Sequence, residues 1–279
     1  MSSQLPDEKP NSQQPRESRS GTVSEAFAFE HVSWSVDEAR ILEQITSNVG
    51  HSRVTALIGP NGSGKSSLLR VLAGVQRPDS GTLEVDGRNW FGESSKNRAR
   101  KLAYVEQSAT ADRSVSVLDV VLLGRTPHRS LFAGVGQRDV AIAREVLELV
   151  GLTEFSEREF GSLSGGERQR ALIAKALAQQ TDILVVDEPT NHLDIAAQLS
   201  TLTLLRGLAT SGRTVLTALH DLNLAATYCD HVLVMDHGRI VAAGAPSEVL
   251  TEELIRKVYN VDSTIMANPR TGKPLIVFG

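Results

Sequence analysis

The sequence contains a single cysteine, Cys229, among 279 residues, so no disulfide can form within the chain. A chain without disulfides suits a reducing compartment. No apolar run approaches the ~18 residues that a membrane-spanning helix needs, and the N-terminus shows no signal-peptide core. We therefore expect any role at a membrane to depend on partner subunits.

Blocks of positive charge are also absent. The net charge is −4 at pH 7, and no segment is rich in lysine or arginine in the way that nucleic-acid-binding surfaces are. We expect no nucleic-acid partner. Hydrophobic residues make up 41% of the chain, an ordinary share for a globular core. Residues 1–24 differ, because their Ser, Gln, Pro and mixed charges predict a disordered N-terminal tail.

A glycine-rich loop lies between an apolar, β-branched run at 54–58 and apolar residues at helical spacing over 68–73. Strand, loop and helix in this order are typical of a phosphate-binding loop. Glycines let backbone N–H groups point at an anion, and the helix N-terminus adds a partial charge of about +0.5. The predicted nucleotide-binding residues are Gly59, Pro60, Asn61, Gly62, Ser63, Gly64, Lys65, Ser66 and Ser67.

Two more apolar runs end in polar residues that suit the same chemistry. Residues 183–186 read as a buried parallel strand and end at Asp187 and Glu188, and residues 215–219 end at His220. Ligands sit at such strand ends in α/β sheets. We expect Ser66 and Asp187 to ligate Mg²⁺, Glu188 to act as general base on a water, and His220 to contact the γ-phosphate.

The rest of the chain predicts two additions to this core. Residues 83–87 read as part of an antiparallel β flank beside the loop, and residues 108–180 take helical spacing and form a helical insertion. A short apolar strand at 102–105 ends near Gln107, which taken alone is a solvated strand end. Residues 247–259 predict one short helix.

The segment Leu163-Ser-Gly-Gly-Glu opens the second helix of that insertion. Ser164 as N-cap with Glu167 three residues later forms a capping box, the simpler structural explanation. Gly165 and Gly166 just inside the helix are costly for capping alone, yet they suit backbone amides that approach an anion closely.

Together with residues 191–194, these segments resemble the nucleotide-binding subunit of ATP-binding cassette (ABC) transporters over about residues 27–244. The resemblance implies an α/β fold, with a P-loop NTPase core, a mixed central sheet, an antiparallel β flank and a helical subdomain. It implies an ATPase that uses ATP and Mg²⁺ to power transport. The implied domains are a tail at 1–24, an ATPase domain at 25–246 with its helical subdomain at about 108–180, and a C-terminal extension at 247–279.

The resemblance also assigns roles across a homodimer. The signature residues of one copy cap the γ-phosphate bound to the loop of the second copy, Gln107 links Mg²⁺ and the attacking water to the helical subdomain, and Asp194 lies across the dimer interface. The implied partners are membrane-spanning permease subunits and, indirectly, an extracytoplasmic substrate-binding protein. The chain is then peripheral, on the cytoplasmic face of the cell membrane. The signature residues are Ser164, Gly165, Gly166 and Glu167.

A narrower likeness comes from residues 123–128, from residues 191–195 with Gln198, and from residues 220–225. These look like the importer ATPases for ferric siderophores, hemin and cobalamin, with ferric siderophore as the first choice of cargo. Two positions depart from the family pattern. Val36 stands where an aromatic residue usually stacks on adenine, with Trp34 two residues earlier, and Glu106 stands where proline usually precedes the glutamine.

Two other classes of function compete with transport. A soluble ABC ATPase acting on ribosomes or DNA would carry two cassettes or a long coiled-coil insertion, and this sequence has one cassette and no such insertion. A nucleotide-binding regulator that does not hydrolyse ATP conflicts with the presence of Glu188 and His220 together.

Overall fold

The computed structural model describes residues 25–107, 112, 114–130 and 134–279, so the predicted tail lies outside the described residues. A six-stranded central sheet has the order β10-β9-β3-β8-β7-β6, in which β9 and β10 pair antiparallel and the other pairs are parallel. This confirms the predicted mixed sheet. The strands are β3 (Val54–Ile58), β6 (Leu102–Val105), β7 (Ile183–Val186), β8 (Thr214–Ala218), β9 (His231–Asp236) and β10 (Arg239–Gly244).

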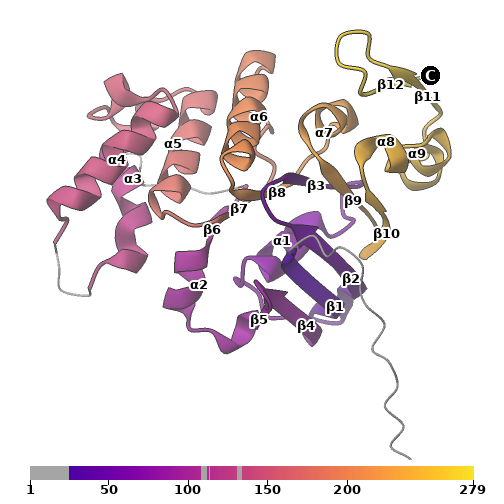
Figure 1. Ribbon diagram of the computed structural model, residues 1–279, viewed down its shortest axis with the longest axis horizontal. Coiled ribbons are helices and arrows are strands. Elements are labelled where there is room, and N and C mark those ends of the chain that lie inside the picture. Colours follow the sequence, from indigo (N-terminus) through magenta and orange to yellow (C-terminus); the bar gives the residue numbers. More distant parts are fainter. Residues whose placement is uncertain (1–24, 108–111, 113, 131–133) are drawn as a thin grey trace, which may run out of the picture.

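Strands β3, β7 and β8 are buried at every residue, as their continuous apolar and β-branched sequences predict for parallel strands covered on both faces. An antiparallel sheet in the order β2-β1-β4-β5 confirms the predicted flank (Figure 1). It consists of β1 (Glu25–Val36), β2 (Ala39–Gly50), β4 (Ser80–Val85) and β5 (Arg88–Asn89). Helix α1 (Lys65–Leu72) buries its leucines in one cluster with residues of both sheets.

The opposite face of the central sheet packs against residues of α3 to α7 and α9 in a second apolar cluster. The predicted helical insertion is present, and it stands to one side of the sheet in Figure 1. Its elements are α3 (Val117–Leu122), η2 (Leu123–His128), α4 (Gln137–Leu149), η3 (Thr153–Phe155), η4 (Phe160–Ser162) and α5 (Gly165–Ala178), and it is preceded by η1 (Trp90–Gly92) and α2 (Ser95–Lys101).

A buried arginine organises this subdomain. Arg125 in η2 donates from Nε to Asp139 of α4 at 2.9 Å and from Nη1 to the carbonyl of Ala178 at 2.7 Å and to Gln180 at 2.9 Å. Its side chain is only 5% exposed. Buried cations need such partners, so one residue of the narrower sequence likeness ties η2 to both α4 and the end of α5.

The short helix predicted near residues 247–259 is present as α9 (Glu252–Tyr259), and a further short helix, α8 (Pro246–Val249), precedes it. The two are separate because Thr251 caps a new helix by accepting from the Leu254 amide at 3.1 Å. A hairpin that was not predicted follows, β11 (Ser263–Ala267) and β12 (Pro274–Phe278).

The carboxamide of Asn223 holds this hairpin, donating to the carbonyl of Ile276 at 3.0 Å and accepting from its amide at 2.7 Å. Asn223 belongs to α7 (Leu222–Tyr228), beside α6 (Ile195–Thr210).

Within the described parts of the chain, no helix combines the length and the apolar character needed to cross a bilayer.

Candidate functional site

The predicted site residues follow four parallel strands of the central sheet. The glycine-rich loop follows β3, His220 follows β8, Asp187 and Glu188 follow β7, and Gln107 follows β6. Because parallel strands place their carboxyl ends at one edge, the sheet order β3-β8-β7-β6 gathers these residues. Residues 108–111, which follow Gln107, lie outside the described residues.

The loop wraps around the side chain of Lys65. Its Nζ donates to the carbonyl of Gly59 at 2.8 Å and to that of Pro60 at 3.0 Å. Gly59 has φ +152°, and a Cβ there would lie 2.2 Å from the carbonyl oxygen of Met235, so only glycine fits. A cavity of about 270 Å³ opens beside the loop, lined by Ile41, Asn61, Gly62, Gly64, Lys65, Ser66, Ser67 and Glu188.

Burial shifts the two charged groups beneath this cavity. Desolvation lowers the pKa of Lys65, and the carboxylates of Glu188 and Asp187 oppose that shift. Desolvation raises the pKa of Asp187, which a hydrogen bond from Ser66 opposes. Both side chains are buried, and in this structure their charges are met by protein groups, the Gly59 and Pro60 carbonyls for Lys65 and the Ser66 hydroxyl for Asp187.

The donor set fits a bound nucleotide and a hard cation. Ser66 Oγ donates to Asp187 Oδ1 at 3.2 Å, so a hydroxyl and a carboxylate already converge. Oxygen ligands of this kind are those that Mg²⁺ takes in phosphate sites, together with water and phosphate oxygens. The hydroxyl of Ser63 is buried inside the loop with no hydrogen-bond partner in the protein, which leaves a polar atom for a ligand to satisfy.

Glu188 is the centre of the site. Its Oε1 contacts Nε2 of His220, and its Oε2 accepts from the side-chain amides of Gln107 and, at 3.0 Å, Asn191. Its φ of +49° is a left-handed conformation that is uncommon outside glycine, and the Asn191 amide donates to its carbonyl at 3.2 Å. Strain of this kind clusters at functional sites.

The start of α5 forms a second cavity, of about 430 Å³. Ser164 Oγ accepts from the Glu167 amide at 3.4 Å, and Glu167 accepts from the Ser164 amide at 2.7 Å, so the capping box is present. A hydrogen bond from the Ser164 amide lowers the pKa of Glu167. A Cβ on Gly166 would lie 2.9 Å from the Cβ of Ala197 in α6, which explains one glycine by packing.

This second cavity shares no lining residue with the cavity at the phosphate loop. Asp194 lines it and also caps α6, accepting from the Ala197 amide at 2.8 Å. The structure therefore groups Gln107, Asp187, Glu188 and His220 with the loop, and Asp194 with the signature residues. A Cβ added to Gly165 would lie 3.7 Å from Leu193, an ordinary contact distance, so packing does not explain this glycine.

Two residues outside the predicted site take part in it. Asn191 joins Gln107 and His220 around Glu188. Gln198 donates to the carbonyls of Thr190 and Leu193, each at 3.2 Å, and so shapes the loop that carries Asp194. Both belonged to segments that carried the family resemblance, which was the available signal.

The residue at the position expected to stack on adenine is exposed. Val36 at the end of β1 is 45% exposed, and Trp34 packs against the apolar cluster that contains α1. The described part of β1 thus offers a small apolar side chain, not an aromatic ring, at that point.

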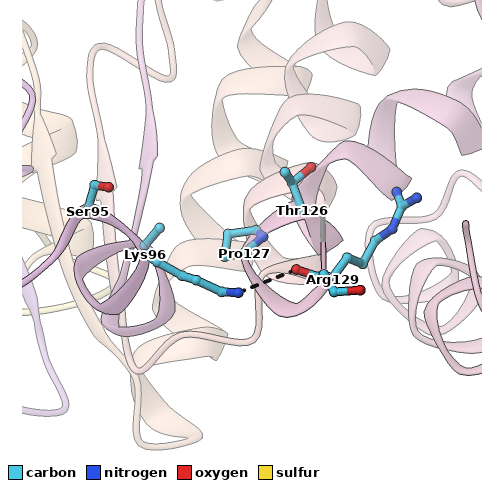
Figure 2. A pocket seen from close by; sticks show the side chains of 7 residues that line it. Ser95, Lys96, Thr126, Pro127 and Arg129 are labelled. Carbon is cyan, nitrogen blue, oxygen red and sulfur yellow. Dashed lines mark hydrogen bonds between the residues drawn. The ribbon is translucent and has the colours of Figure 1, made fainter. Parts of the chain in front are cut away.

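A further pocket, of about 690 Å³, lies between the core and the helical subdomain (Figure 2). Ser95, Lys96 and Ala99 of α2 line one side, and Thr126, Pro127, Arg129 and Ser130 line the other. Lys96 Nζ donates to the carbonyl of Arg129 at 3.5 Å across it. Anything bound in this pocket would contact both parts of the molecule.

Comparison with known proteins gives a consistent result. The family model described as ABC transporter matches residues 42–191, more than half of the chain. The ferric enterobactin transport ATP-binding protein FepC of Escherichia coli (strain K12) is 40% identical over 238 residues, covering 85% of this chain and 88% of the relative. The hemin import ATP-binding protein HmuV of Thermobifida fusca is 39% identical over 263 residues, covering 94% and 91%.

Solved structures share the fold. One described as an inward-facing conformation of a metal-chelate type ABC transporter superposes with a TM-score of 0.80 at 29% identity, covering 91% of this chain and 97% of that one. The dimeric structure of MJ0796, a bacterial ABC transporter cassette, superposes with a TM-score of 0.71 at 26% identity, covering 79% of this chain and 98% of that one.

Proposed function

This chain belongs to the ABC transporter family, and we propose that it drives the import of an iron chelate by closing as a homodimer on two ATP molecules with Mg²⁺. It is the ATP-hydrolysing subunit of a metal-chelate-type ABC importer, with the α/β ABC ATPase fold and a dimeric cassette that works with a permease. The observation that carries the hydrolytic part of the proposal is the placement of Glu188 between Gln107 and His220.

The loop holds the triphosphate. The backbone N–H groups of the loop residues other than Pro60, which has none, surround the phosphates, and Lys65 exchanges its carbonyl partners for phosphate oxygens. Ser66 and Asp187 would hold Mg²⁺, with Gln107 as a further ligand. When bound, Mg²⁺ neutralises charge that develops on the phosphate oxygens.

Glu188 orients and deprotonates the attacking water. Its carboxylate is held from both sides, at Oε1 by His220 and at Oε2 by Gln107 and Asn191, so it is fixed for proton transfer before the reaction begins. His220 lies beside Glu188 at the same edge of the sheet, where it would contact the γ-phosphate and stabilise the charge that develops there. The positions of Glu188 and His220 follow from the pairing of β7 with β8, which brings the residues after these strands into contact.

The second copy completes the site. Ser164 and the exposed amides of Gly165 and Gly166 cap the γ-phosphate bound to the partner's loop, with Glu167 fixing the cap and Asp194 crossing the interface. The two cavities of one chain share no lining residue, which supports this arrangement. A phosphate in the loop of one chain would meet the signature residues of a second chain. Closure of the dimer is then the mechanical step.

The membrane-spanning subunits contact this protein at the cytoplasmic face of the membrane. We infer that a segment of the permease occupies the pocket between α2 and η2 (Figure 2), because that pocket joins the core to the helical subdomain. Lys96→Glu would place a negative charge in it. Co-purification with the permease should then weaken, while ATP binding by the isolated chain is kept.

The cargo is most simply a ferric siderophore, with hemin and cobalamin as alternatives. Relatives of similar identity carry either ferric enterobactin or hemin in their names, so the choice rests on the sequence likeness. An extracytoplasmic binding protein would deliver the chelate to the permease. Growth of a deletion strain on individual iron chelates tests the assignment. Loss of growth on a ferric siderophore is the expected result, and loss on hemin alone would contradict it.

A further inference from the structure

An ion pair links the helix of the phosphate loop to the end of strand β6. Arg70 Nη2 of α1 lies 2.7 Å from Glu106 Oε1, and the two side chains are 38% and 40% exposed. Glu106 is the residue that stands where proline usually precedes the glutamine. Exposed ion pairs contribute little to stability, so the pair calls for an explanation other than folding.

The contact of Arg70 with Glu106 is one of two side-chain contacts made from the same face of α1. Ser66 and Arg70 are four residues apart, so they share a helix face. Ser66 contacts Asp187 after β7 at 3.2 Å, and Arg70 contacts Glu106 after β6. The Asp187 amide also donates to the carbonyl of Val105 at 2.9 Å, which joins the two strand ends. Helix α1 therefore contacts the residues that follow β6 and those that follow β7.

The residue next to Glu106 is Gln107, whose amide donates to Glu188. A proline at position 106 would restrict the backbone there, because its ring fixes φ near −65°. Glutamate leaves φ free. In this chain the side chain of Glu106, held by Arg70, supplies a constraint at the same point.

We propose that Arg70 and Glu106 are positioning residues that hold Gln107 against Glu188. Neither side chain belongs to the set that lines the cavity at the loop. The inference rests on the role given to Gln107 in the proposed function. It adds that the helix following the loop sets the place of the glutamine through the charge pair of Arg70 and Glu106.

The test is steady-state ATP hydrolysis by the reconstituted transporter. Glu106→Ala and Arg70→Ala should each lower kcat by about three- to tenfold, because a small misplacement of a reacting group is costly. KM for ATP should stay within about twofold, since the loop contacts remain. The exchange Arg70→Glu with Glu106→Arg should recover most of the loss. Asp262→Ala, which removes an exposed pair with Arg256, is the matched control and should change neither constant.

A second measurement separates this inference from the proposed function. In a Gln107→Ala background, adding Glu106→Ala should produce no further loss of kcat, because the residue acts through the glutamine. An equal further loss would overturn the inference, as would an unchanged kcat in both single variants or a rise in KM alone. Wild-type hydrolysis by Gln107→Ala itself would instead contradict the role of Gln107 in the proposed function.

Discussion

Glu188 and His220 are in direct contact, Oε1 against Nε2, although 32 positions separate them in the sequence and different strands carry them. Strands β7 and β8 pair in parallel register, with Val186 opposite Thr217, and so bring the two residues that follow them to the same edge. The contact joins the proposed base to the residue proposed to contact the γ-phosphate.

Glu188→Gln should bind ATP as tightly as the wild type and lose hydrolysis by about 10²-fold or more, since a general base contributes 10²–10⁴. The amide keeps the size of the side chain but cannot accept the proton. Phosphate release and nucleotide binding measured on the same preparation test this. Glu148→Gln, on the exposed side of α4, is the control. A Glu188→Gln protein that hydrolyses ATP at the wild-type rate would remove Glu188 from the role of base.

His220→Ala should lower kcat by about 10²-fold, the usual effect of removing one donor to a developing charge. ATP affinity should change little, because the loop and Lys65 hold the triphosphate. His51→Ala is the matched variant. That histidine also pairs with an acid, Asp86 at 3.3 Å, but precedes β3 at the far end of the strand from the loop. Equal losses in both histidine variants would show a general effect on the fold.

Ser164→Ala should have two effects that a matched variant separates. Loss of the N-cap should cost about 1 kcal/mol of unfolding free energy, and Thr251→Ala at the start of α9 should cost a similar amount. Only Ser164→Ala should also weaken ATP-dependent dimerisation, measured by sedimentation in the Glu188→Gln background. Equal dimerisation of the two variants would reduce Ser164 to a capping residue.

Arg125→Met should lower the free energy of unfolding, measured in urea, by about 3–5 kcal/mol. The change leaves the buried carbonyl of Ala178 without this donor and Asp139 without its charged partner. Arg256→Met, in an exposed pair, should cost under about 1 kcal/mol. A small cost at Arg125 would mean that η2, α4 and α5 are held by apolar packing alone.

The same arginine predicts a pH dependence. The hydrogen bond from Arg125 holds the pKa of Asp139 below its ordinary value of 3.8. The pair therefore stabilises the folded state above that value and loses its effect as the pH falls through the folded pKa. The difference in unfolding free energy between the wild type and Arg125→Met should shrink below about pH 4. A difference that stays constant with pH would contradict the pairing.

Much of the site could be predicted because its signals are local. Apolar runs that stop at a charged or polar residue mark strand ends, and the structure confirms strands before Asp187 and Glu188 and before His220. The capping box at Ser164 and Glu167 is likewise a short-range pattern. Local patterns gave the elements, and the sheet order then brought their ends together.

What could not be predicted depends on contacts between distant residues. Arg125 is buried, whereas charged residues are usually exposed, and only its partners on α4 and after α5 explain it. The pairing of Arg70 with Glu106 spans 36 positions. The hairpin of β11 and β12 consists of two short strands, whose attachment to Asn223 no local pattern announces.

The central claim is that each ATP lies between the loop of one copy and the signature residues of the other. It is tested by ATP retention of Glu188→Gln protein mixed with an excess of Lys65→Ala protein, whose own loop is disabled. In such a heterodimer the bound ATP meets only the signature of the Lys65→Ala chain. Adding Ser164→Ala to the Lys65→Ala chain should abolish retention, and adding it to the Glu188→Gln chain should leave retention unchanged. The opposite pattern would place both surfaces in one chain and contradict the account.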